Sequence, residues 1–260
     1  MSVLAGLLAL ATGLAYTGLG LITGYELGRH SAKRGISQFG AAFMVMAFTC
    51  GPHHLVHAVH LLFEGERPTP ELTVALAIGV VPGLVFVLLR VEAAFGGRGD
   101  RLVRNDPAWL IALPWVIVFA SGAILALASA RAIREHAALI GVLPNVVLFV
   151  NYAIVGILVR RTQTARRPLL GGWSLSGVSM AGVFTTCAVA HLTAGLTVAP
   201  DPHMLMFDLP GVPFSIFFLW TVHRIHAKSL PDWNRRPLVG RATATSRRSP
   251  WATVPEPARS

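Results

Sequence analysis

Long apolar segments run through almost the whole chain, and they constrain its fold more than any other feature. A helix needs about 20 mostly apolar residues to cross a bilayer. Charged residues make up 13% of the 260 residues, about half of their usual share in a soluble domain. The sequence therefore predicts an all-α, polytopic, multi-pass protein of the cell membrane. Seven transmembrane helices are expected, at 3–23, 38–63, 72–91, 109–130, 137–159, 172–198 and 204–223.

Basic residues gather on one side of these spans. All of the 22 Lys and Arg residues except Arg67, Arg131 and Arg134 follow the first, third, fifth or seventh span. By the positive-inside rule this side is cytoplasmic, which places the N-terminus outside and the C-terminus inside. Anionic lipid facing this surface accounts for the net charge of +10 without a nucleic-acid partner. Residues 229–260, rich in Arg, Pro, Ser and Thr, are predicted to form a disordered basic cytoplasmic tail.

The motif Thr-Cys-x-x-x-His-Leu occurs twice, at Thr49–Leu55 and at Thr186–Leu192. The two copies are 137 positions apart and contain both cysteines of the chain. Weaker matches in the flanking spans occur in the same order, which indicates a 3+1+3 internal repeat whose halves cross in the same direction. The expected halves are 1–95 and 137–228, joined by a linker helix at about 109–130, all within one transmembrane domain of residues 1–228.

Cysteine and histidine at positions i and i+4 lie on one face of a helix. Ionisable side chains inside spans usually face the bundle interior and often mark a functional site. At about 100° per residue, each of the two helices presents one such face. The second span contributes Met46, Cys50, His53, His54, His57 and His60, and the sixth contributes Met180, Cys187 and His191.

Imidazole, thiolate and thioether ligands suit copper(I) or zinc better than magnesium or calcium. Two cysteines with His54 and His191 supply the four ligands of a tetrahedral site, and Met46 and Met180 favour copper over zinc. The favoured hypothesis is a transition-metal site in the outer half of the bundle, for metal handling or metal-dependent redox chemistry. An outer relay or loading site is expected from His53, His57, His60, His203 and Asp208.

Three other interpretations remain open. A b-type haem would take His191 and either His54 or His57 as axial ligands. A solute or proton-coupled transporter would use the histidines to line a cavity. In a purely structural interpretation the cysteines pack as small apolar residues, and the histidines bind Asn145 and Asn151 across the bundle. No motif in the sequence decides whether the protein is an enzyme.

Overall fold

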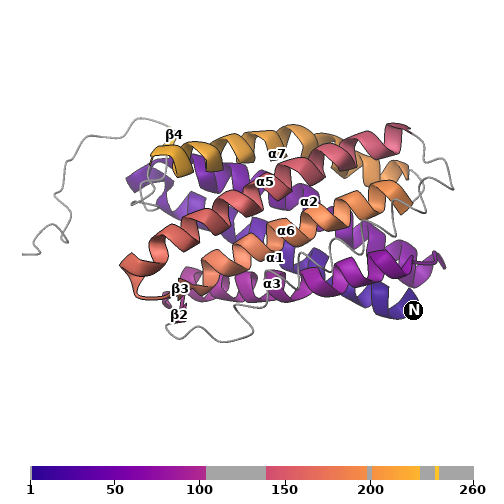
Figure 1. Cartoon of the computed structure of the whole chain (residues 1–260), viewed down its shortest axis with the longest axis horizontal. Helices are drawn as coiled ribbons and strands as arrows, with labels where there is room; N and C mark the ends of the chain where they lie inside the picture. The colour runs from indigo at the N-terminus through magenta and orange to yellow at the C-terminus, as the bar shows by residue number, and fades with distance from the viewer. Residues whose placement is uncertain (1, 104–138, 198–200, 229–237, 240–260) are drawn as a thin grey trace, which may run out of the picture.

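The computed structural model describes residues 2–103, 139–197, 201–228 and 238–239. In this part of the chain, six long helices run side by side along one bundle (Figure 1). Each is long and apolar enough to cross a membrane, as predicted for six of the seven spans. The expected span at 109–130 lies outside the described residues. The helices are α1 (Ser2–Arg34), α2 (Gln38–Phe63), α3 (Pro70–Ala94), α5 (Leu139–Leu170), α6 (Leu175–Thr197) and α7 (Pro202–Lys228).

Several helices continue past the predicted spans. α1 ends at Arg34 instead of residue 23, and α5 ends at Leu170 instead of residue 159. The span prediction follows apolar side chains, whereas helical hydrogen bonds join backbone groups and continue into polar sequence. The bounds of α2 agree with the predicted segment 38–63.

Serine and threonine side chains begin several of these helices. Ser37 accepts a hydrogen bond from the Gly40 amide at the start of α2, and Ser174 accepts one from the Gly177 amide beside the start of α6. Thr69 caps α3 in the same way. Such caps satisfy amide groups that have no partner inside the helix. They fix where α2 and α6, the helices with the shared motif, enter the bundle.

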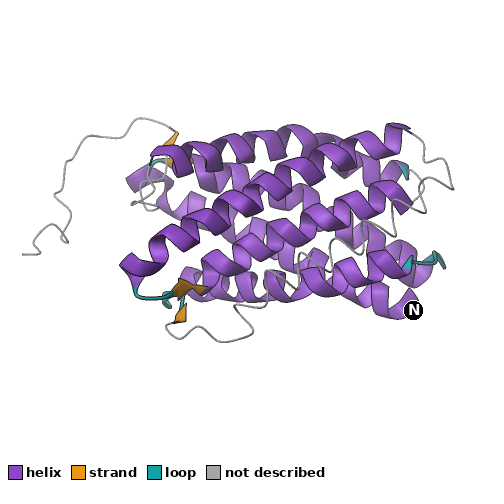
Figure 2. Ribbon diagram, viewed as in Figure 1, coloured by secondary structure: helices purple, strands orange, loops and turns teal. Residues whose placement is uncertain are grey.

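Four two-residue strands form two antiparallel ladders at one end of the bundle (Figure 2). β1 (Ile36–Ser37) precedes α2 and pairs with β4 (Leu238–Val239), while β3 (Trp173–Ser174) precedes α6 and pairs with β2 (Leu102–Val103). Because α1 leads into β1 and α5 leads into β3, both helices run towards this same end. Leu238 and Val239 belong to the tail predicted to be disordered, and these two residues are paired.

The helices form two groups that contact each other. α1 packs against α2 and α3, α5 packs against α6 and α7, and the pairs α2–α7 and α3–α6 join the groups. α2 and α6 are the most buried of the six. Aromatic rings fill the centre towards the strand end, where Phe43 and Phe184 both contact Phe218. The buried threonine, cysteine and histidine residues of α2 and α6 follow these rings towards the other end.

Candidate functional site

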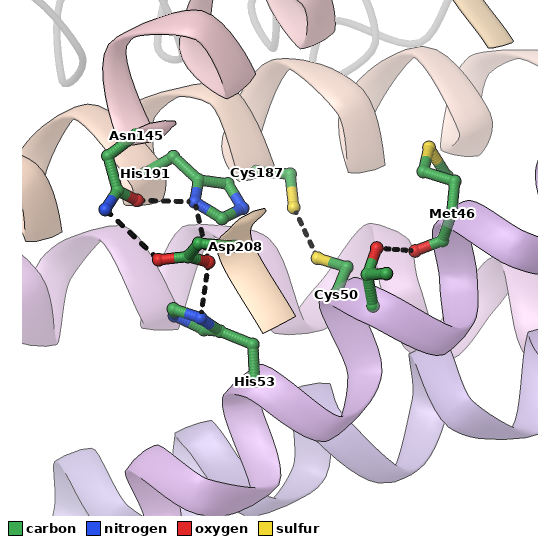
Figure 3. Close-up of polar contacts among 8 residues, drawn as sticks. Met46, Cys50, His53, Asn145, Cys187, His191 and Asp208 are labelled. Carbon is green, nitrogen blue, oxygen red and sulfur yellow. Dashed lines mark hydrogen bonds and ion pairs between the residues drawn. The ribbon is translucent and has the colours of Figure 1, made fainter. Parts of the chain in front are cut away.

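The two cysteines meet at the centre of the bundle. Cys50 Sγ on α2 lies 2.9 Å from Cys187 Sγ on α6, and both thiols are free and buried (Figure 3). The shared motif predicted that these side chains face a common point, and the structure brings them together. Sulfur from one half of the chain therefore contacts sulfur from the other.

His54 adds an imidazole to the two thiols. One of its ring nitrogens, Cys50 Sγ and Cys187 Sγ all lie within 4.8 Å of one another, and the three residues are buried. Within the described chain, His54 Nδ1 has no hydrogen-bond partner. The Tyr16 ring contacts the imidazole at a centroid distance of 5.7 Å. The group thus offers two sulfur donors and one nitrogen donor, shielded from water.

Asn145 orients His191, which lies one helical turn after Cys187 on α6. Asn145 Nδ2 donates to Asp208 Oδ2 at 3.2 Å, so its Oδ1 faces His191 Nδ1, at 2.8 Å. An amide oxygen only accepts hydrogen bonds. His191 Nδ1 therefore carries the proton, and the lone pair is on Nε2. Histidines that bind metals usually donate their second N–H to an oxygen in this way.

Asp208 connects these residues to His53. Asp208 Oδ1 lies 2.8 Å from His53 Nδ1 and 4.0 Å from His191 Nδ1, and the carboxylate is 3% exposed (Figure 3). The residues of this network come from α2, α5, α6 and α7. The sequence had suggested Asp208 for a relay and Asn145 as a partner of a histidine. The structure places both of them in one buried network next to the thiols.

A small cavity lies beside the thiols, with space on the order of one water molecule. A haem between His191 and His54 or His57 would need space for a macrocycle, which is more than this cavity provides. Met46 shares the cavity with the thiols, whereas Met180 is buried in the surrounding hydrophobic cluster. The cavity is lined by Tyr16, Met46, Cys50, Tyr152, Phe184 and Cys187, among others.

Sequence analysis did not assign Tyr16 and Tyr152 to the site. Tyr16 contacts His54, and Tyr152 contacts His191 at a centroid distance of 5.4 Å. Each tyrosine therefore packs against the histidine of one motif. The signal was present in the sequence, because the two tyrosines are separated by nearly the same interval as the two cysteines.

The predicted set of metal ligands does not gather at one point. His60 lies near the end of α2, where it groups with Asp201 and His203 instead of the thiols. His57 lies between these two groups along α2; it is buried, and its Nε2 has no hydrogen-bond partner among the described residues. The histidines of α2 thus follow a line from the centre of the bundle to one end.

No protein family, no curated protein and no solved structure matches this chain.

Proposed function

We propose that this chain is a multi-pass membrane protein that binds one soft transition-metal ion, foremost copper(I), through Cys50, His54 and Cys187. The observation that carries the proposal is the group of three buried donor atoms within 4.8 Å of one another. Sulfur and imidazole ligands select copper(I) or zinc over magnesium and calcium. Metal handling or metal-dependent redox chemistry is the function that this ligand set suits.

The separation of the sulfur atoms is compatible with such a site after a small adjustment. Two sulfurs bound tetrahedrally at about 2.3 Å from a metal are about 3.8 Å apart, compared with 2.9 Å here. Side-chain rotation of Cys50 and Cys187 would supply the difference of about 1 Å. Both thiols would release their protons on binding. His191, with its lone pair on Nε2, is the candidate for a fourth ligand that the shared motif supplies.

The proposed placement in the membrane follows from charge. Basic residues of α1, α3, α5 and α7 lie at the strand end of the bundle, called here the basic end. The positive-inside rule makes this end cytoplasmic and the N-terminus external. His54 then lies on the outer side of Cys50.

A seventh crossing is part of the same proposal. The described chain leaves the basic end at Val103 and resumes at Leu139, the start of α5, at the opposite end. This supports the predicted span at 109–130 and the parallel 3+1+3 repeat. The ladders β1–β4 and β2–β3 support the repeat as well, because each joins the segment before the middle helix of one half to the segment after the last helix of the other.

Copper(I) retention tests the metal proposal. Reduced protein in detergent would be loaded with copper(I) under anaerobic conditions, freed of excess metal and analysed for copper per chain. We expect one equivalent in the wild type and a loss of most of it in C50S, C187S and H54A. His30→Ala is the matched control, since His30 is an exposed histidine. Full retention by the C50S/C187S double variant would refute the proposal.

A proton pathway is the second candidate, and the contacts from His53 through Asp208 and Asn145 to His191 favour it. Such a chain of buried ionisable groups is typical of proton-coupled carriers. Proteoliposomes with an internal pH-sensitive dye would report proton entry. For a proton pathway we expect D208N to lose the proton flux and C50S to keep it. A process that depends on the thiols would instead be lost in C50S.

A further inference from the structure

We propose that His60, Asp201 and His203 form a second metal site, which takes a borderline divalent cation such as Cu²⁺ or Zn²⁺. The site lies at the end of the bundle opposite the basic end, where α2 finishes and α7 starts. It has a different ligand set from the thiol site and does not depend on it. It therefore goes beyond the function proposed above.

The three side chains already converge. His60 Nδ1 lies 3.0 Å from Asp201 Oδ2, and His203 Nδ1 lies 3.3 Å from Asp201 Oδ1. One ligand atom from each residue lies within 4.8 Å of the other two. The two imidazole rings meet edge to face, with centroids 5.9 Å apart. Two nitrogens and one carboxylate oxygen are ligands that zinc and copper(II) accept.

Asp201 is held in position by the backbone of α7. Its Oδ1 accepts a hydrogen bond from the His203 amide, and its carbonyl accepts one from the Leu205 amide. These are the contacts of a residue that caps a helix. The carboxylate is therefore fixed before any cation binds, and Oδ2 remains directed at His60.

The surrounding charge favours a cation. Glu64 and Glu66 each have an oxygen within 4 Å of the His60 ring, in addition to Asp201. Among the described residues, Arg67 is the one Lys or Arg at this end, and it is exposed. A divalent cation would relieve the repulsion among the three carboxylates.

His57 gives the site a connection to the interior. It lies one turn inside His60, is 2% exposed, and its Nε2 has no hydrogen-bond partner in the described chain. From His60 to Cys50 the distance along α2 is about 15 Å, at 1.5 Å per residue. The two metal sites are thus distinct, and His57, whose Nε2 has no partner among the described residues, lies between them on α2.

Copper(II) binding to the C50S/C187S double variant tests this site alone. The full chain, without a polyhistidine tag, would be titrated with Cu²⁺ in detergent and followed by electron paramagnetic resonance. We expect one ion per chain with a nitrogen-ligated spectrum, and an affinity at least about tenfold lower when His203→Ala or Asp201→Asn is added. His203 has a side chain that is 73% exposed, so its removal should leave the fold intact.

His223→Ala is the matched control, an exposed histidine at the basic end. Unchanged affinity in both His203→Ala and Asp201→Asn, or an equal loss in His223→Ala, would overturn the proposal. Copper(I) retention by the wild type is measured separately. If the wild type retains no copper(I) but the double variant binds Cu²⁺ as expected, only the thiol site is overturned. If the wild type retains copper(I) but the double variant does not bind Cu²⁺, only the site at His60 is overturned.

Discussion

Gly51 allows α1 to approach α2 directly beside the thiols, and its replacement by alanine tests how the site is held. A Cβ at this position would lie 2.6 Å from the Thr17 nitrogen and 3.0 Å from its Cα. Ordinary contact begins at about 3.4 Å, so the backbone of α1 must move by about 0.8 Å. Overpacking of this kind costs about 1–3 kcal/mol, and alanine recovers about 0.5–1 kcal/mol through its helix preference.

A net loss of about 1.5 kcal/mol corresponds to a melting temperature about 3–6 °C lower for a chain of this size. A thiol-reactive dye reports this melting temperature well, because Cys50 and Cys187 are the only cysteines in the chain and are buried until the protein unfolds. Gly28→Ala is the control, since a Cβ at Gly28 meets no atom within 4 Å. Gly28→Ala gains the same helix preference without the new contact, so a melting temperature of Gly51→Ala equal to that of Gly28→Ala would refute the packing described at Thr17.

Two further changes test the buried network and the carboxylates at the end of the bundle opposite the basic end. Asn145→Leu removes a hydrogen-bond partner from both His191 and Asp208. We expect it to lower the free energy of unfolding by about 1–3 kcal/mol, measured with the same thiol-reactive dye. Thr164→Leu, on the exposed surface of α5, is the control and should cause no loss. Burial raises the pKa of Glu66, so the folded state holds this proton to a higher pH than the unfolded state. Ionised Glu66 therefore disfavours folding at neutral pH, and this effect disappears as the pH falls through the raised pKa. Glu66→Gln should melt above the wild type at pH 7, with a difference that shrinks towards pH 4 in tryptophan-fluorescence melts; a difference independent of pH would contradict the assignment.

The helices could be predicted because bilayer thickness sets a length that apolar sequence must match. The meeting of Cys50 and Cys187 could be predicted for a related reason. Two copies of one motif, each near the middle of its span, place the thiols at equal depth, and buried ionisable residues face the interior. The sequence thus predicts the depth of each thiol in the membrane and the side of its helix that faces the interior. The packing of α2 and α6 inside the bundle brings the two thiols together.

The sequence predicted an outer site that includes His60 and His203, but it did not predict that Asp201 joins them. His60 and Asp201 are far apart in sequence, and they meet only because α2 ends where α7 begins. No periodic pattern records where a loop residue lies relative to a distant helix end. The pairing of Leu238 with Ser37 was missed for a similar reason, since a two-residue strand shows no alternation and its surroundings have the composition of a disordered tail.

Asp208 provides the strongest physical argument that the centre of this bundle has a function beyond packing. Asp208 lies almost two turns inside α7 and is 3% exposed, and an aspartate within a membrane helix costs up to about 2.5–3.5 kcal/mol to insert. Two cysteines that merely packed together would need no such group, because apolar residues of similar volume fill a core at lower cost. The carboxylate instead orients Asn145, and Asn145 fixes the tautomer of His191 beside Cys187. Residues from four helices thus fix the direction of one imidazole lone pair. A lone pair fixed in this way can bind a metal ion or accept a proton, and packing alone does not require it.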